Sequence, residues 1–287
     1  MSLRINTNIS AANAYRNLSI NDKSVAGSLE KLSSGLRINR AADDAAGLSI
    51  SEGLKSQIGG LTVAARNAQD GVNVAQTADG ALNETSSILQ RMRDLSVQAA
   101  NSGSQDLDGK TAANTEFTQL NKELDRIVLS TKFGTQPLLD GNYNGAFQVD
   151  SASINTNAGA QINVDLSAGT LATASGLAGL DSAGLGTAGL DLTADASAAI
   201  DAVDIAIKGV STVRSTIGAY QNRFEHTINN VNVAIENLSA SKSSITDTDM
   251  ASEMVKFSKN QILSQAGTAM LAQANQTGQG VLKLLNG

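Results

Sequence analysis

Four charged residues within eight positions form the first group of side chains that could do chemistry: Arg37, Arg40, Asp43 and Asp44. Adjacent carboxylates can coordinate a metal ion or act together as an acid and a base. No third metal ligand stands at a spacing that would complete such a site, so we predict no metal here. The pattern favours a salt-bridged joint between helices, in which the aspartates cap helix ends.

Two further patterns are weaker candidates for chemistry. Gly184, Gly186 and Gly189 fit the spacing G-x-G-x-x-G, but a dinucleotide site also needs a preceding strand and flanking βαβ units, which the sequence does not predict. His226 is the only histidine and lies inside a long helical pattern, where a position at the surface is the default. No Ser/His/Asp set, HExxH pair or P-loop occurs. We therefore predict neither an enzyme nor a bound cofactor.

The composition favours thin helical packing. The chain of 287 residues has one proline, no cysteine, no tryptophan, five phenylalanines and three tyrosines, whereas thick cores are usually filled with aromatic side chains. Its net charge of −6 argues against nucleic-acid binding through a basic face. Neither a secretory signal nor a run of about 18 apolar residues occurs, so general rules predict a cytoplasmic protein without membrane insertion.

The strongest periodic pattern covers residues 200–238, where apolar residues recur at alternating steps of three and four. Such a seam marks a helix that packs along its length against other helices. Similar seams predict helices over residues 11–36, 61–100 and 111–130. Because short connections favour antiparallel neighbours, we expect the last two to fold back on each other and to form a long three-helix rod with 200–238. The seam of that helix is Ile200, Val203, Ile207, Val210, Arg214, Ile217, Gln221, Phe224, Ile228, Val231, Ile235 and Leu238.

The segments between these helices have a different character. Residues 133–192 are rich in small and polar residues, and their turn signals and short alternating runs predict one or two β-hairpins at the end of the rod. Glycines in residues 33–60 and serines in residues 239–253 predict breaks in the helices. Both ends of the chain carry an apolar stripe beyond such a break, which predicts segments that order on assembly. The seam of helix 11–36 alone leaves open whether it packs within its own chain or against other chains.

Several runs of residues resemble the bacterial flagellins, the subunits of the flagellar filament. The runs are LSSGLRIN (32–39), DDAAG (43–47), LTVAARNAQDG (61–71), GALNE (80–84), LQRMRDL (89–95), GAYQNRF (218–224), ILSQAG (262–267) and LAQANQ (271–276). They cover both ends of the chain, and only residues 142–194 lack a clear match. Since many flagellins insert large outer domains in that interval, the resemblance implies a minimal subunit without them.

The resemblance implies a mainly α fold of two domains. Residues 1–56 and 241–287 pair as an inner coiled-coil domain, and residues 57–240 form the antiparallel helical coiled-coil rod, with helices 61–100, 111–130 and 196–238 and hairpins within 133–192. The four charged residues of the joint lie in one of two spokes between the domains, where we expect Arg40 to pair with the cluster of Asp43 and Asp44. The terminal arms carry the residues expected to assemble with further copies: Leu18, Val25, Leu29, Leu32, Met254, Phe257, Ile262 and Leu284.

The same resemblance implies partners and a location. Flagellins leave the cell unfolded through the flagellar type III export apparatus, which implies an export chaperone and a filament cap as further partners. This route replaces the cytoplasmic prediction with an extracellular filament. Some flagellins are also bound by an animal Toll-like receptor, and the matching residues here are Gln90, Arg91, Leu95 and Glu116. The chain departs from that motif at Asp94, where glutamate is commoner, and in a spacing that is one residue longer.

Two alternatives remain open at this point. A hook–filament junction protein resembles flagellin at both ends, although the match of residues 262–276 and the short middle favour flagellin. A membrane-active translocator with amphipathic arms is an alternative of another class. Its arms should carry basic faces, which this chain does not show.

Overall fold

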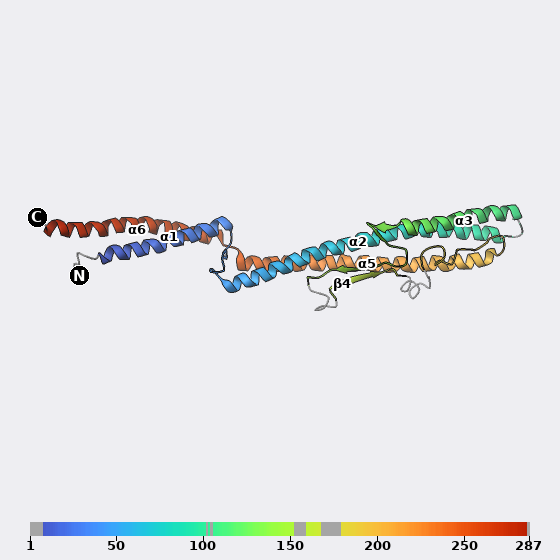
Figure 1. Cartoon of the computed structure of the whole chain (residues 1–287), viewed down its shortest axis with the longest axis horizontal. Coiled ribbons are helices and arrows are strands. Elements are labelled where there is room, and N and C mark those ends of the chain that lie inside the picture. The colour runs from blue at the N-terminus through green and yellow to red at the C-terminus, as the bar shows by residue number, and fades with distance from the viewer. Residues whose placement is uncertain (1–7, 102, 104–105, 152–158, 168–178, 286–287) are drawn as a thin grey trace. The chain divides into compact units, whose positions relative to one another are not determined.

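The protein is mainly helical, with two small antiparallel sheets, as predicted (Figure 1). The computed structural model describes residues 8–101, 103, 106–151, 159–167 and 179–285, with side chains as far as Gln276. The chain forms two compact units, which we call unit 1 (Met1–Ser56 with Asn237–Gly287) and unit 2 (Gln57–Glu236). Whether these units are the inner and rod domains of a filament subunit stays a prediction.

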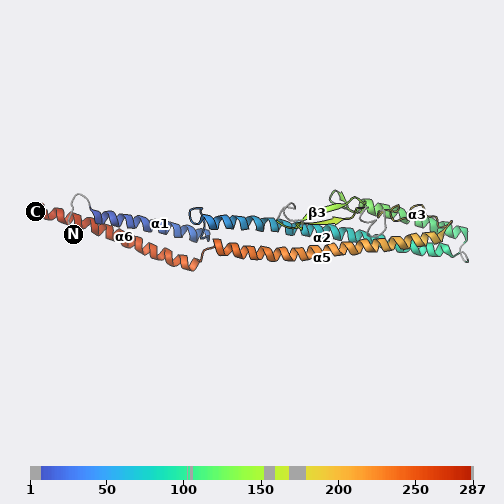
Figure 2. The same cartoon turned by 90° about the horizontal axis from the view of Figure 1, so that it is seen from below.

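Unit 2 is built on three helices. It contains most of α2 (Ala45–Ala100) and α5 (Ala196–Thr246), and all of α3 (Leu107–Ser130). Within the unit, α2 and α5 run side by side in opposite directions, and α3 folds back along α2 (Figures 1 and 2). The expected antiparallel arrangement of the three helices is therefore confirmed.

Two hairpins follow α3. Strand β1 (Lys132–Phe133) pairs with β2 (Gln136–Pro137) across a turn in which Gly134 has φ of 62°. Strand β3 (Asn144–Gln148) pairs with β4 (Gln161–Asp165), with Asn144 opposite Asp165. Ile162 and Val164 are buried in the core of unit 2. They stand two residues apart and so lie on the same face of β4, because successive side chains of a strand point to opposite faces.

The predicted seam of α2 is the core of unit 2. The spacing of three and four predicts this seam at Leu61, Ala65, Ala68, Val72, Ala75, Ala78, Leu82, Thr85, Leu89, Met92 and Leu95, and all are buried except Ala65, which is half-buried. In α5 every second predicted position from Val203 to Val231 is buried, namely Val203, Val210, Ile217, Phe224 and Val231, whereas Leu238 is half-buried.

Two of the positions of α5 between them are shifted by one residue from the prediction. Ala206 and Val213 are buried, whereas Ile207 and Arg214 are half-exposed. Apolar residues stand on both sides of the seam in that stretch, so spacing alone could not choose between them. Arg214 lies at the edge of the seam, where its Nε donates to Asp79 Oδ1 over 2.9 Å.

Several predicted helix ends are wrong because side-chain caps outweigh glycine and serine content. Helix α2 begins at Ala45 rather than at residue 61, since the carboxylate of Asp44 accepts a hydrogen bond from the Gly47 N–H at 2.9 Å. Helix α3 begins at Leu107 rather than 111, where Asp106 caps it by accepting from the Gly109 N–H. Helix α5 continues through the serine-rich segment to Thr246.

Unit 1 pairs α1 (Ile9–Ser34) with α6 (Met250–Leu285), which runs antiparallel to it (Figures 1 and 2). Helix α1 ends at Gly35, whose φ of 72° is the left-handed conformation that glycine adopts most readily. The segments that follow α1 and α5 pair with each other, because the Arg37 N–H donates to the Thr246 carbonyl at 2.7 Å and the Thr248 N–H donates to the Gly35 carbonyl at 2.9 Å.

Candidate assembly and recognition surfaces

The two helices of unit 1 meet along a seam in which small and polar residues alternate with a few larger apolar ones. Its members are half-buried or buried and repeat at steps of three and four: Ala11, Ala14, Leu18, Asn21, Val25, Ser28 and Leu32 on α1, and Glu253, Phe257, Asn260, Ser264, Gly267, Leu271 and Ala274 on α6. Leu18 packs against the backbone of Gly267, where a Cβ would lie 3.3 Å from Leu18 Cδ1. Such a seam allows close approach of the helices but buries little apolar surface.

Ten other large apolar side chains of the same helices point away from the seam. We call them the outward apolar surface: Ile9, Tyr15, Ile20 and Leu29 on α1, and Met250, Met254, Val255, Ile262, Leu263 and Met270 on α6. Each is at least 41% exposed. Monomeric proteins seldom expose so many large apolar residues on one helix pair, which marks this surface as a site of interaction.

The predicted arm residues divide between these two places. Leu18, Val25, Leu32 and Phe257 lie in the seam of the helix pair. Leu29 (56% exposed), Met254 (51%) and Ile262 (65%) lie on the outward apolar surface. The side chain of Leu284 lies outside the described residues. The spacing predicts the seam of helix 11–36 at Ala11, Tyr15, Leu18, Asp22, Val25, Leu29, Leu32 and Leu36. Tyr15 and Leu29 are exposed, because the seam passes through Ala14 and Ser28 instead.

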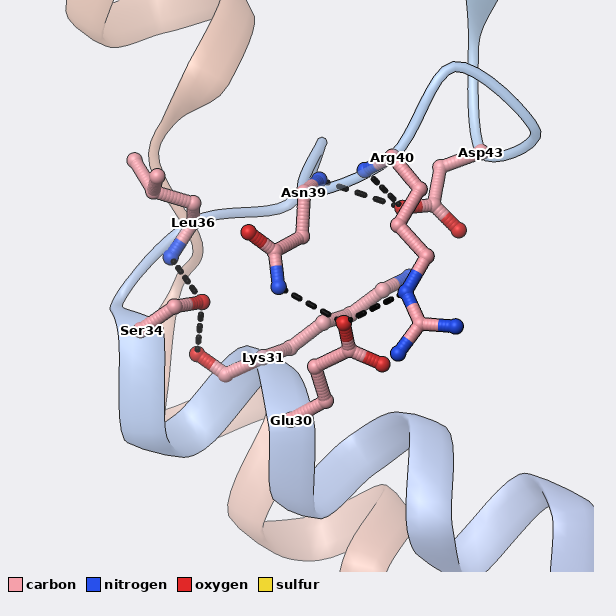
Figure 3. Close-up of polar contacts among 7 residues, drawn as sticks. All are labelled: Glu30, Lys31, Ser34, Leu36, Asn39, Arg40 and Asp43. Carbon is pink, nitrogen blue, oxygen red and sulfur yellow. Dashed lines mark hydrogen bonds and ion pairs between the residues drawn. The ribbon is translucent and has the colours of Figure 1, made fainter.

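The joint after α1 is held by hydrogen bonds rather than by the expected ion pair (Figure 3). Asp43 Oδ2 accepts from the backbone N–H groups of Asn39 (3.1 Å) and Arg40 (2.9 Å), and these bonds, that from Arg40 first, lower the pKa of the Asp43 carboxyl. The Arg40 guanidinium turns away from the aspartates and donates to Glu30 Oε1 at 2.8 Å, which also accepts from the Asn39 amide at 2.7 Å. The prediction that Arg40 pairs with Asp43 and Asp44 is therefore wrong, whereas the aspartates do cap the backbone.

Arg37 has a different role in the same joint. Its Nη2 donates to the carbonyl of Ile245, and its backbone N–H donates to that of Thr246. A single residue therefore ties the segment after α1 to the end of α5 within unit 1.

On unit 2, the four residues predicted for receptor recognition are brought together only in part. Arg91 on α2 and Glu116 on α3 form a two-bonded ion pair, with distances of 2.8 Å and 3.1 Å. Their hydrogen bonding raises the pKa of Arg91 and lowers that of Glu116. Gln90 is exposed beside them, but Leu95 is only 2% exposed and belongs to the core.

Arg93 forms a second ion pair two residues further along α2. Its Nε donates to Asp204 Oδ1 of α5 at 2.6 Å. Arg91 and Arg93 therefore connect α2 to its two neighbouring helices.

The glycines of the G-x-G-x-x-G match lie in a turn-rich segment packed against α3. Gly186 and Gly189 have φ of 72° and 75°, and Gly184 lies so close to the backbone of Gly179 that a Cβ would be 2.4 Å away. Asp125 of α3 accepts from both the backbone N–H (2.8 Å) and the hydroxyl (3.0 Å) of Ser182. These glycines are explained by the turns they form.

Comparison with known proteins now decides the family. The family model described as the bacterial flagellin N-terminal helical region matches residues 5–144, and that of the bacterial flagellin C-terminal helical region matches residues 200–285. The chain belongs to the bacterial flagellin family. Only residues 145–199 lie between the two matched regions, as expected for a flagellin without large outer domains.

Individual flagellins match over nearly their whole length. The flagellin of Halalkalibacterium halodurans is 49% identical over 282 residues, which are 98% of this chain and 99% of that protein. The flagellin of Bacillus subtilis is 46% identical over 307 residues, 99% of this chain and 100% of that protein. Among solved structures, Bacillus cereus flagellin is 30% identical over 62% of this chain and 94% of that chain, with a TM-score of 0.44. Flagellins are structural proteins, in agreement with the prediction that this chain is not an enzyme.

Two further results concern the alternatives from the sequence. In the described part of the chain, no helix is long and apolar enough to span a membrane. No group of three or more histidine, cysteine, aspartate or glutamate side chains is placed to hold a metal ion among the same residues.

Sequence reasoning missed the polar contacts that cross between distant helices. The clearest is the hydrogen bond from Ser28 Oγ to Glu253 Oε1, at 2.7 Å. The residue types gave a signal for it, since a carboxylate and a serine stand at seam positions of α6 and α1. The spacing of residues within one helix, however, does not show which residue of another helix they contact.

Proposed function

We propose that copies of this chain polymerise into an extracellular flagellar filament through the outward apolar surface of unit 1. The exposure of Ile262, Met254 and Leu29 in the single chain carries the proposal. A large apolar side chain that leaves water on assembly contributes about 1.5–3 kcal/mol at full burial, so a few such contacts per subunit support a stable polymer. In this polymer, residues 1–56 with 241–287 form the inner coiled-coil domain, and residues 57–240 form the rod.

The route to the filament follows from the same family. We expect export through the flagellar type III apparatus, with an export chaperone and a filament cap as partners. What supports this is the burial along α1 and α6, where most seam residues are only half-buried, since a helix pair with few fully buried side chains costs little to unfold for passage through a channel. The hook–filament junction alternative is less well supported, because the relatives with near-complete coverage are flagellins.

Electron microscopy of the purified chain under polymerising conditions tests the assembly function. The full chain should form helical filaments, and a chain without residues 241–287 should remain soluble and unassembled. A sharper pair of variants places a charge on α6: Ile262→Asp at the 65% exposed apolar position, and Gln261→Asp at the adjacent exposed polar one. We expect Ile262→Asp to abolish filaments and Gln261→Asp to retain them. Filaments formed by Ile262→Asp would contradict the proposed role of this surface.

We also propose that the Arg91–Glu116 pair forms part of a surface bound by an animal Toll-like receptor. What supports it is the geometry of the pair, which presents a planar guanidinium and a carboxylate next to exposed Gln90. Leu95 acts in this surface by packing α2 into the core, because its side chain is not accessible to a partner.

A receptor reporter assay with two arginine variants tests recognition. Arg91→Ala should reduce the response. The control is Arg93→Ala, which removes a similarly exposed ion pair, with Asp204 of α5, and should leave the response unchanged. An unchanged response to Arg91→Ala, or equal losses in both variants, would contradict the assignment. Because exposed ion pairs contribute little to stability, both proteins should keep the melting temperature of the parent.

A further inference from the structure

The seam of unit 1 contains a buried charge. Among the described residues, Glu253 is the one charged side chain in the buried class, with 6% of its surface exposed. It lies in the first turn of α6, opposite Ser28 of α1, which is also 6% exposed. Charged side chains are seldom buried unless they are paired and hydrogen-bonded, so the environment of this carboxylate is specific.

Glu253 has one partner on each helix. Oε1 accepts from the Ser28 hydroxyl at 2.7 Å, and Oε2 accepts from Lys256 Nζ at 3.1 Å. Lys31 of α1 adds a further positive charge nearby, and Arg37, Asp43 and Asp44 of the joint line the same cavity of about 360 Å³. The contact with Lys256 stays within α6, so the hydrogen bond from Ser28 is the one that depends on how the two helices are aligned.

The rest of the seam does little to fix that alignment. The larger side chains that α1 contributes, Leu18, Val25 and Leu32, recur every seven residues, so a slide by one heptad replaces each with the next. Two further polar links between described residues of the pair, Ser264 to Asp22 at 2.8 Å and Asn8 to the Ala274 carbonyl at 2.9 Å, are exposed, so water can replace them. A slide by one heptad, about 10 Å, would leave the Glu253 carboxylate buried without the Ser28 hydroxyl.

We propose that Ser28 and Glu253 form a register lock, a buried hydrogen bond that selects one alignment of α1 against α6. Buried polar residues in coiled coils are best attested in this role, where they lower stability and fix register. The register lock itself does not depend on the proposed assembly function. Its consequence for the polymer does rest on that proposal. A helix pair held in one register presents the outward apolar surface in one arrangement.

Disulfide formation can report the register, because the chain has no cysteine of its own. A Cβ built on Gly267 lies 3.8 Å from Leu18 Cβ, a separation that suits a disulfide, so Leu18→Cys with Gly267→Cys reports the native alignment. Leu18→Cys with Asn260→Cys or with Ala274→Cys reports a slide of seven residues in either direction. All three reporter positions on α6 lie on the seam.

The three reporters are combined with Ser28→Ala, Glu253→Leu and Glu253→Gln in the full chain. Without these changes the native disulfide should dominate. Ser28→Ala and Glu253→Leu should lower the ratio of native to shifted disulfides about tenfold, the loss expected for one hydrogen bond to a charged group. Glu253→Gln keeps an acceptor for Ser28 and should stay within about twofold of the parent. Glu253→Leu should leave the helix content by circular dichroism undiminished, because leucine favours helices.

The outcomes separate a register lock from a general stabilising contact. An unchanged disulfide ratio in both Ser28→Ala and Glu253→Leu overturns the lock. A parallel loss of helix content and of all three disulfides also overturns it, since that result means that the helices no longer pair. If none of the three reporter chains forms a disulfide without further changes, either before or after polymerisation, then α1 and α6 do not pair and the lock is overturned. Disulfide formation and filament formation are measured separately, so a failure to assemble can be distinguished from a failure of the lock.

Discussion

The two units of this flagellin distribute their apolar residues in opposite ways. In unit 2, α2, α3, α5 and the hairpins bury a continuous apolar core that includes Leu82, Phe117 and Phe224. In unit 1, Ile38 is the one large apolar side chain in the buried class among the described residues, and the other buried side chains are Ser28, Ser51, Thr246 and Glu253. Unit 1 instead exposes large apolar residues on α1 and α6.

This contrast separates self-sufficient folding from folding that depends on copies. A core of the kind found in unit 2 stabilises a single chain, because the apolar surface leaves water without any partner. A helix pair with a small, polar seam is marginal on its own and gains stability only when its outer faces are covered. We therefore expect unit 2 to stay folded in the single chain and unit 1 to order during polymerisation.

Phe224→Ala should destabilise unit 2, with the largest loss of unfolding free energy among the variants considered. The ring is fully buried and contacts Phe147 edge-on, with centroids 5.4 Å apart. Its removal should cost about 3–5 kcal/mol of unfolding free energy. Denaturation followed by circular dichroism checks this, with Phe257→Ala in the seam of unit 1 as the control that leaves the transition of unit 2 unchanged. Equal effects of the two variants would remove the contrast between the units.

Two glycine substitutions in α2 sharpen the view of that core. A Cβ at Gly71 would lie 2.5–2.8 Å from the Phe224 ring, so Gly71→Ala should overpack the core and destabilise unit 2 by about 1–3 kcal/mol. A Cβ at Gly80 would meet nothing within 4 Å, and Gly80→Ala should stabilise the same helix by about 0.5–1 kcal/mol. Thermal unfolding of the two variants should show shifts of opposite sign, and shifts of the same sign would show that helix propensity outweighs packing at Gly71.

Much of unit 2 could be predicted from the sequence, because a long apolar period survives small errors. The seam of α2 was correct at nearly every position, and the five positions of α5 from Val203 to Val231 are buried as expected. Helix ends were predicted less well. Single caps such as Asp44 and Asp106 decide where α2 and α3 begin, and composition over a window of residues does not reveal them.

The candidate surfaces could be predicted only in part, for a physical reason. Spacing indicates which residues share a face of a helix, but not which face meets a partner. In α1, Leu29 fits the seam by spacing and hydropathy, yet Ser28 occupies it because Glu253 lies opposite. In the same way Arg40 has carboxylates close in sequence, but its guanidinium pairs with Glu30, ten residues away.

A polar anchor in unit 2 tests whether its stability comes only from the apolar core. Asp125 accepts two hydrogen bonds from Ser182, at 2.8 Å and 3.0 Å, and holds the turn segment to α3. Asp125→Ala should cost about 1–2 kcal/mol, less than the loss of the Phe224 ring. The control, Glu123→Ala, removes a carboxylate that pairs only with Arg126 in the same helix and should leave unfolding unchanged. Denaturant midpoints of the two variants check this, and equal midpoints would mean that the turn segment needs no anchor.

The smallest expected effect is the loss of stability of the unit 1 helix pair in acid. It is visible only when the pH titration of the parent is compared with that of Glu253→Gln. The hydrogen bond from Ser28, with a smaller contribution from Lys256, lowers the pKa of Glu253 from its ordinary value of 4.5. A carboxyl with a lowered folded-state pKa stabilises the fold above its unfolded value, and this contribution is lost as the pH falls through the folded pKa. The helix pair of unit 1 should therefore weaken below about pH 4.5 more steeply in the parent than in Glu253→Gln, which has no proton to take up.

Other carboxyls of unit 1 titrate in the same range, so the comparison must be made pairwise. Backbone N–H groups lower the pKa of Asp43, and the hydroxyls of Ser243 and Thr246 lower that of Asp247. Both groups are present in the parent and in Glu253→Gln, so their effects cancel when the two curves are subtracted. The loss of helix content by circular dichroism at each pH is the measurement, in filaments or in solution, because protonated thiols form no disulfides in acid. Identical curves below pH 4.5 would show that the buried carboxylate contributes nothing to the acid sensitivity of unit 1.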